Sequence, residues 1–283
     1  MILSAGRLAW QALWRFLAHN GPDRAAAIAY YTLLSLLPLL IFVISVGMAA
    51  LGSFDQAYRG SLILFQGVVV HLDPASLDAL RGFVERAVRF QWPGLLLLAW
   101  TAKRSFTALF AALETIFGVP PRGFARGNLL ALGMVLLTGV GLLATMAMSM
   151  VMAMLEGLVL RVAGATGAQA LEGLAAGFFT HLLPVIVTFG FFHIVYRLVP
   201  GGVVPPRAAV AGAGLATLLW EGAKAGFAYY VRNLAHYAGL YGALEGLTVL
   251  ALWLELSVSI VLYCGEVVAL LVPAPGKPTA TRA

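Results

Sequence analysis

Six ionisable side chains stand inside long apolar stretches of this sequence, and they are the residues best placed to do chemistry. They are Lys103, Arg104, Glu221, Lys224, Glu255 and Glu266. A charged side chain costs about 2.5–3.5 kcal/mol at the centre of a bilayer on insertion scales, so such groups face the interior of a helix bundle or a water-filled cavity. The three cations and three acids leave two interpretations open. The charges either form structural ion pairs or line a polar cavity that meets a charged ligand.

Helical spacing places several of these groups on common faces. Glu221 and Lys224 are three residues apart and share a face. The last apolar stretch carries a polar stripe at steps of seven, four and seven, formed by Thr248, Glu255, Ser259 and Glu266. The structural interpretation pairs Glu221 with Lys224. It pairs the acids of the stripe with Lys103 or Arg104. In the functional interpretation, the three cations meet a negative group, and the acids pair with them or relay protons.

Two prolines lie in the middle of apolar stretches. Proline cannot donate the usual helical hydrogen bond, so Pro38 leaves the carbonyl of Leu34 without its partner, and Pro184 acts in the same way in a later stretch. We expect both helices to be kinked there. His181 shares a face with Pro184 and joins the candidate cavity residues. Kinks that bend away from each other would open space between helices at mid-depth, although prolines in membrane helices also serve packing alone.

The residue patterns of soluble enzymes are missing. The five histidines are scattered over different segments, and no HxH, HExxH or CxxC spacing occurs, so we expect no metal site. The sequence has no GxxxxGK[ST] loop for nucleotide phosphates and no GxSxG elbow. The net charge of +6 is spread over short loops rather than gathered in a stripe, which argues against a nucleic-acid partner. We therefore expect no enzyme activity and no cofactor.

Long apolar helices must position the charged residues. Of the 283 residues, 61% are hydrophobic and only 11% are charged, against about 25% charged in soluble domains, so the class is integral membrane protein. Six stretches reach the roughly 20 residues that a spanning helix needs. They are Ala25–Leu51, Pro93–Phe117, Leu129–Leu155, Leu174–Val199, Ala208–Val231 and Leu244–Val272. The sequence therefore predicts an all-α protein with six transmembrane helices in one domain, residues 1–272.

Segments outside the spans have their own character. In residues 1–20, four apolar residues share one helical face, Trp10, Leu13, Trp14 and Leu17, with Arg7, Gln11 and Arg15 opposite. This pattern predicts an amphipathic helix that lies on the membrane surface or packs on the protein itself. The long loop 52–92 carries charges of alternating sign beside an apolar stripe, which predicts a helical extracytoplasmic cap. Residues 273–283 are rich in proline and polar residues, as in a disordered tail.

Loop charges and small residues indicate orientation and packing. Lys and Arg are more frequent in the loops on the side of the N-terminus, so both termini are expected in the cytoplasm. Ala208, Gly212 and Ala216 recur every four residues, and Gly222 and Gly226 repeat this spacing. Small residues at this spacing let helices approach closely. We read the pattern as packing within the chain, with a homo-oligomer as the alternative use.

Two motifs resemble the BrkB/YihY family of bacterial inner-membrane proteins. One is AYYTLLSLLPLL, which contains Tyr30 and Tyr31. The other runs from Tyr241 to Leu270, with the pair Tyr241–Gly242, then Trp253, then Gly265–Glu266. The resemblance covers almost the whole chain and implies six spans with a long first outer loop. Glu245 and Glu255 depart from the family pattern, so the resemblance favours Glu266 for a shared role. Some family members are linked to envelope lipid export, and others carry an old ribonuclease BN label.

The sequence and the resemblance together suggest an inner-membrane protein that moves or flips a lipid or other amphipathic anion without ATP hydrolysis. Membrane lipids are then its expected partners. The first alternative is an envelope scaffold that transports nothing, in which the buried charges are purely structural. The remote alternative is a ribonuclease, which the scattered histidines and the lack of an RNA-binding domain disfavour.

Overall fold

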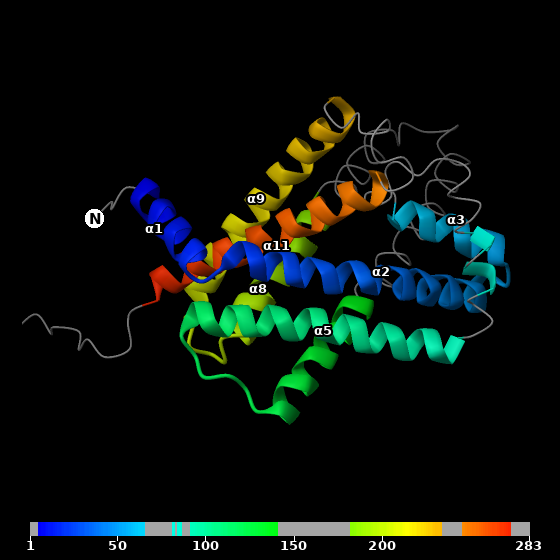
Figure 1. Cartoon of the computed structure of the whole chain (residues 1–283), viewed down its shortest axis with the longest axis horizontal. Helices are drawn as coiled ribbons and strands as arrows, with labels where there is room; N and C mark the ends of the chain where they lie inside the picture. The colour runs from blue at the N-terminus through cyan, green and yellow to red at the C-terminus, as the bar shows by residue number, and fades with distance from the viewer. Residues whose placement is uncertain are drawn as a thin grey trace, which may run out of the picture.

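The computed structural model describes residues 5–65, 81–82, 84–86, 91–140, 182–233 and 245–272, and the regular structure within these ranges is helical (Figure 1). The labelled helices are α1 Ala5–Ala18, α2 Gly21–Leu51, α3 Phe54–Phe65, α5 Gln91–Phe117, α8 Leu183–Leu198, α9 Pro206–Asn233 and α11 Glu245–Leu271. A further helix covers Phe124–Val140. The all-α prediction is confirmed for the part of the chain that the structure describes.

Two of the described helices are long and apolar enough to cross a membrane. They are Gly21–Ala49 within α2 and Leu247–Leu271 within α11. Phe124–Val140 and Pro184–Leu198 are apolar but shorter. α5 and α9, with 27 and 28 residues, are long enough to span but carry four of the six ionisable groups. The membrane class is thus supported by two full-length candidates, whereas the count of six spans stays a prediction.

The helices pack around α2 and α11. α2 lies against both α5 and α11, and α9 lies against both α8 and α11. Figure 1 shows α2 and α5 side by side and running in opposite directions. α1 packs on α11, so the first and last described helices of the chain are neighbours. This arrangement brings residues from both ends of the sequence to one end of the bundle.

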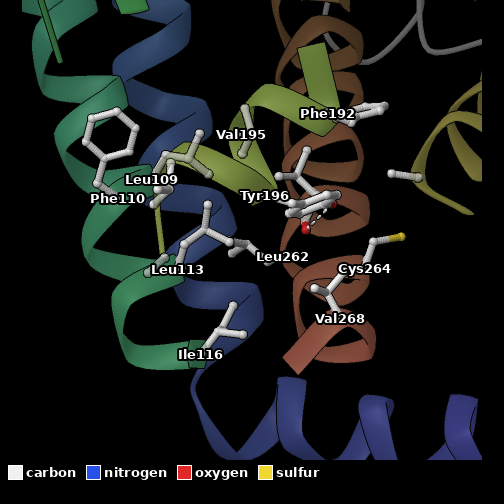
Figure 2. Close-up of a cluster of buried hydrophobic side chains, with 14 of the residues drawn as sticks. Leu109, Phe110, Leu113, Ile116, Phe192, Val195, Tyr196, Leu262, Cys264 and Val268 are labelled. Atoms are coloured by element: carbon white, nitrogen blue, oxygen red, sulfur yellow. Dashed lines mark hydrogen bonds between the residues drawn. The ribbon is translucent and has the colours of Figure 1, made fainter. Parts of the chain in front are cut away.

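The main core lies between α5, α8 and α11 (Figure 2). Leu113, Tyr196 and Leu262 are fully buried there, and the Tyr196 hydroxyl donates a hydrogen bond of 2.9 Å to the carbonyl of Val261. Because lipid tails are as apolar as leucine, close van der Waals packing must hold such helices together in a bilayer. A buried hydroxyl bond between α8 and α11 adds a directional link to that packing.

Small residues set the closest approaches in this core. A Cβ added at Gly212 would lie 2.0 Å from Val268 Cγ2, so α9 and α11 touch where no side chain fits. One added at Gly265 would lie 3.1 Å from Leu113 Cδ2. Ala208 and Ala216 are buried on the same face as Gly212. The predicted small-residue face of residues 208–216 therefore serves packing within the chain, while Gly222 and Gly226 have open space around them.

The two prolines occupy different positions in their helices. α2 continues as one helix from Gly21 to Leu51 with Pro38 inside it. Next to Pro38, the Ser35 hydroxyl donates to the Thr32 carbonyl at 2.7 Å. Pro184 is the second residue of α8 and its side chain is exposed, and the chain before Leu182 lies outside the described ranges. The expected kink at Pro184 therefore stays a prediction.

The predicted outer loop 52–92 begins with helix α3, which folds back on the end of α2. Ala57 and Tyr58 are buried against Ile44 and the short helical piece at Val84. Asp55 and Arg81 form an exposed ion pair of 2.5 Å between the two parts of the loop. Helical structure is thus present in the described parts of this loop.

Candidate functional site

The carboxylate of Glu266, near the end of α11, is completely buried and meets two basic side chains from the start of the chain. His19 Nδ1 lies 2.5 Å from Glu266 Oε1, and Arg15 Nε lies 3.3 Å from Glu266 Oε2. When the carboxylate is ionised it only accepts hydrogen bonds, and His19 is then the donor in the first contact. Oε2 has no aligned hydrogen-bond donor, which makes its contact with Arg15 an ion pair by distance alone.

The turn between α1 and α2 positions these partners. Asn20 has a positive φ of 54°, a conformation that asparagine tolerates, and it ends α1 one residue before α2 begins. Gly21 lies beneath the ring of Phe16, where a Cβ would be 2.3 Å from the ring atoms. Arg24 Nε donates to the carbonyl of His19 at 2.9 Å. The turn is therefore fixed from both sides, and His19 faces α11.

Both α1 and α11 contribute further contacts around this cluster. Phe16 is buried in the main core, and the Tyr263 hydroxyl donates to the carbonyl of Ala9 at 3.3 Å. One face of α1 and its turn therefore packs on the helix bundle, and it carries Arg15, Phe16 and His19. The apolar face of α1 remains exposed, and its members are Trp10, Leu13, Trp14 and Leu17.

The expectation that Glu266 pairs with Lys103 or Arg104 is wrong, because Arg15 and His19 take that place. In the sequence, Arg15 belongs to the polar face of an amphipathic helix, and His19 is one of five scattered histidines. A signal was present: these two bases are four residues apart on one face. They stand on the same predicted side of the membrane as Glu266.

Arg104 on α5 has surroundings of the opposite kind. Its side chain is exposed, and its guanidinium carbon lies 4.9 Å from the ring centre of Trp100 and 5.8 Å from that of Tyr31. No carboxylate of the described residues lies within ion-pair distance of Arg104 or of the half-buried Lys103. Arg104 is thus a cation held over two aromatic rings.

Two hydroxyls fix the helices beside this cation. Thr32 Oγ1 and Ser105 Oγ lie 2.6 Å apart and join α2 to α5. Thr32 also donates to the carbonyl of Ile28 at 2.9 Å, so Ser105 supplies the proton of the bond between the helices. Each hydroxyl is the chain neighbour of a residue at the site, Tyr31 or Arg104.

The depth of Arg104 follows from its position in α5. Arg104 is the fourteenth of the 27 residues of Gln91–Phe117, so it stands at the middle of a helix about 40 Å long at 1.5 Å per residue. The hydrocarbon layer of a bilayer is about 30 Å thick. If α5 spans the bilayer, then Arg104 lies near its middle.

Glu221 and Lys224 on α9 form the predicted ion pair, with Oε2 and Nζ 2.8 Å apart. The pair is partly exposed, and Glu221 Oε1 has no hydrogen-bond partner. An apolar groove of about 390 Å³ between α8 and α9 is lined by Val185, Ile186, Phe189, Gly214, Thr217, Leu218 and Glu221. The predicted pairing of Glu221 with Lys224 is therefore confirmed, and Lys224 is not available as a free cation.

Within the described residues, the acids expected to line one cavity have separate surroundings. Trp253 of α11 packs on Trp220, next to Glu221, with ring centres 5.6 Å apart. Glu266 is thirteen residues beyond Trp253, about 20 Å farther along the helix. Glu255 and Ser259 lie between them, partly exposed, and neither has an ion pair or hydrogen bond in the described part of the chain. The polar stripe of α11 thus runs from the Glu221–Lys224 pair at one end to the Arg15–Glu266 cluster at the other.

A second, largely buried ion pair links Glu114 of α5 to Arg122 in the segment that follows this helix. Arg122 Nη1 lies 2.6 Å from Glu114 Oε1. The same guanidinium donates to the carbonyls of Leu198 and Val199 at the end of α8. Arg122 therefore satisfies carbonyl groups that a helix end leaves without partners. This pair has a structural role.

Some expected site residues lie outside the described ranges, namely His181, Tyr241 and Gly242. The remaining residues of the resemblance motifs are distributed over the sites above. Tyr30 and Tyr31 stand at Arg104 with ring centres 5.7 Å apart, and Gly265 precedes Glu266. Within the described residues, no three His, Cys, Asp or Glu side chains are grouped to hold a metal ion.

The sequence is similar to one family of membrane proteins along most of its length. The sequence model of the family described as Virulence factor BrkB matches residues 12–281. A UPF0761 membrane protein of Tolumonas auensis is 32% identical over 270 residues, which cover 91% of this chain and 83% of that protein. One from Azotobacter vinelandii is 31% identical over 268 residues, or 92% of this chain and 62% of the relative. The chain thus spans less than two thirds of several relatives' length. No solved structure matches.

Proposed function

We propose that this chain, which belongs to the BrkB family of membrane proteins, moves a lipid or other amphipathic anion across the membrane without ATP hydrolysis. The observation that carries the proposal is the exposed guanidinium of Arg104 at the middle of α5, with no carboxylate partner among the described residues. Transport of this kind breaks no covalent bond, so no enzyme activity or cofactor is needed.

The distribution of the other charges supports this reading. Lys224 is used by Glu221, Glu266 by Arg15 and His19, and Glu114 by Arg122. A purely structural account of the charges would give Arg104 a partner of the same kind. A lone guanidinium in hydrocarbon costs about 2.5–3.5 kcal/mol on insertion scales. That cost is offset when an anion or water reaches the group, as a transport site requires.

Orientation in a bacterial inner membrane is part of the proposal. Arg122 joins the end of α5 to the end of α8, and Gly265 lies beside Leu113 of α5, so these ends and α1 share one side. This side carries more basic than acidic residues at its surface. Its exposed or half-exposed residues include the acid Asp23 and the arginines Arg7, Arg24, Arg126 and Arg207. By the positive-inside rule, this side faces the cytoplasm.

The test is lipid movement in vesicles that contain only the pure protein. A fluorescent phosphatidylglycerol in both leaflets is quenched from outside by dithionite, and the quenched fraction reports transfer between leaflets. We expect wild-type protein to raise that fraction above one half without nucleotide, and Arg104→Ala to lower the rate. Arg126→Ala, which changes an exposed arginine of another helix, is the matched control. No transfer by folded wild-type protein would reject transport and favour the envelope scaffold.

A further inference from the structure

We infer that Arg104, Trp100 and Tyr31 form a binding site for the phosphate headgroup of an anionic phospholipid, on the outer surface where α5 meets α2. The inference rests on the proposed function and deepens it, because it names the substrate class and the residues that receive it. Its ligand is defined by two chemical parts, a phosphate ester and an attached apolar chain. Each part has its own support in the structure.

Binding of the phosphate headgroup is supported by the N–H donors of the Arg104 guanidinium, which are free within the described residues. Arginine presents N–H groups in a planar fork that matches two oxygens of a phosphate, and the aromatic rings leave these N–H groups unused. The guanidinium carbon is 4.9 Å from the Trp100 ring centre and 5.8 Å from that of Tyr31. Lys103, the preceding residue, adds a second positive charge without a carboxylate in the described ranges. The local potential therefore favours an anion.

The chain part is supported by the exposed side chains next to the cation. Leu97, Trp100 and Arg104 are spaced at i, i+3 and i+7, so they form one face of α5, and all three are exposed. On α2, Tyr30 and Leu34 are exposed four residues apart. An amphiphile with its phosphate on Arg104 can thus lay an acyl chain along Trp100 and Leu97. A small soluble phosphate would leave this apolar face uncovered.

The site is held in place before any ligand arrives. The 2.6 Å bond between Thr32 and Ser105 fixes α2 against α5 at the residues adjoining Tyr31 and Arg104. Both hydroxyl protons are already used, one on the Ile28 carbonyl and one between the two hydroxyls. These hydroxyls therefore act as positioning groups and do not bind the phosphate. Such fixing lowers the ordering cost of binding.

Binding is measured directly, apart from transport. Pure protein in a neutral detergent is titrated with dioctanoyl phosphatidylglycerol, and bound lipid is counted by native mass spectrometry. We expect Arg104→Ala to weaken binding about tenfold or more, since hydrogen bonds to charged groups are worth about 1.5–3 kcal/mol. Arg104→Lys keeps the charge but loses the fork and should bind with intermediate strength. Arg126→Ala should bind as wild type. Thermal unfolding of each variant checks that it is folded.

The control ligands separate the two parts of the inference. Inorganic phosphate and glycerol phosphate should displace the lipid only at far higher concentration, because they lack the chain. Dioctanoyl glycerol, which lacks phosphate, should not compete. Equal displacement by free phosphate would overturn the lipid assignment, and equal lipid binding by folded Arg104→Ala and wild type would overturn the site.

The binding and vesicle results also distinguish the inference from the proposed function. If lipid binding depends on Arg104 but no lipid is transferred in vesicles, the binding site is supported and the proposed transport is rejected. Transfer that continues unchanged in Arg104→Ala, with unchanged lipid binding, would keep transport and reject the site.

Discussion

Glu266 and Arg104 are charges on two helices that both pack against α2, and their surroundings are opposite. The Glu266 carboxylate is 0% exposed and lies within 3.3 Å of two basic side chains. The Arg104 guanidinium is exposed and meets only aromatic rings among the described residues. The first charge is placed to hold helices together, and the second is left available. A count of charges in apolar stretches cannot tell these two uses apart, whereas their partners can.

The largest expected effect comes from removing both partners of Glu266. In the double variant Arg15→Ala/His19→Ala, a buried carboxylate would remain without compensation, and breaking a buried pair in this way costs about 3–5 kcal/mol of stability. Thermal unfolding in detergent should show a marked loss relative to wild type. Adding Glu266→Gln should restore much of the stability, because a neutral amide needs no cation. Failure of this third change to rescue the double variant would show that α1 is held by packing alone.

An intermediate effect is expected from filling the closest approach in the same part of the bundle. Gly212→Ala would place a methyl group 2.0 Å from Val268 Cγ2, so the Val268 side chain must move or α9 and α11 must separate. Overpacking of this kind costs about 1–3 kcal/mol. Gly214→Ala, two residues along where a Cβ meets nothing within 4 Å, is the matched control. Equal unfolding temperatures for the two variants would contradict the close contact, and Val268→Ala should relieve the strain of Gly212→Ala.

The smallest effect on stability is expected at Arg104. Its side chain is exposed and pairs with no described carboxylate, so Arg104→Ala should change the free energy of unfolding by no more than about 0.5 kcal/mol in either direction. The same variant should lose lipid binding. A loss of stability as large as that of the Arg15→Ala/His19→Ala variant would erase the contrast between the two charges and make Arg104 a structural residue.

Local patterns in the sequence predicted the local structure well. The amphipathic spacing of residues 1–20 predicts a helix, and α1 covers Ala5–Ala18. The apolar stretches beginning at Ala25 and Leu244 correspond to α2 and α11. The pair Glu221–Lys224 was predictable because both partners lie on one helical turn. Helix periodicity and ion pairs at short spacing are properties of neighbouring residues, so one sequence is sufficient to reveal them.

Contacts between distant segments could not be predicted in this way. Arg15 and His19 reach Glu266 across a separation of 247 residues for the histidine. Their spacing of four residues indicates a shared basic face, but it does not identify Glu266 as the acid that this face meets. Helix α3 lies in the loop that was predicted to be helical, and the spacing of Phe54, Ala57 and Tyr58 is helical, but its packing on the end of α2 was not predicted. Arg122 looked like an ordinary loop cation, yet it is largely buried and bonds to Glu114 and to the end of α8. Tertiary packing decided each of these.

The link between His19 and Glu266 has a consequence for how the chain is made. A ribosome produces α1 and its turn first and α11 after every other described helix. The contact spans 247 residues, so it can close only after α11 has been made. Until then, Arg15 and His19 cannot form their contacts with Glu266. Docking of α1 on α11 would thus be a late step in the assembly of the described helices, as long-range contacts generally are.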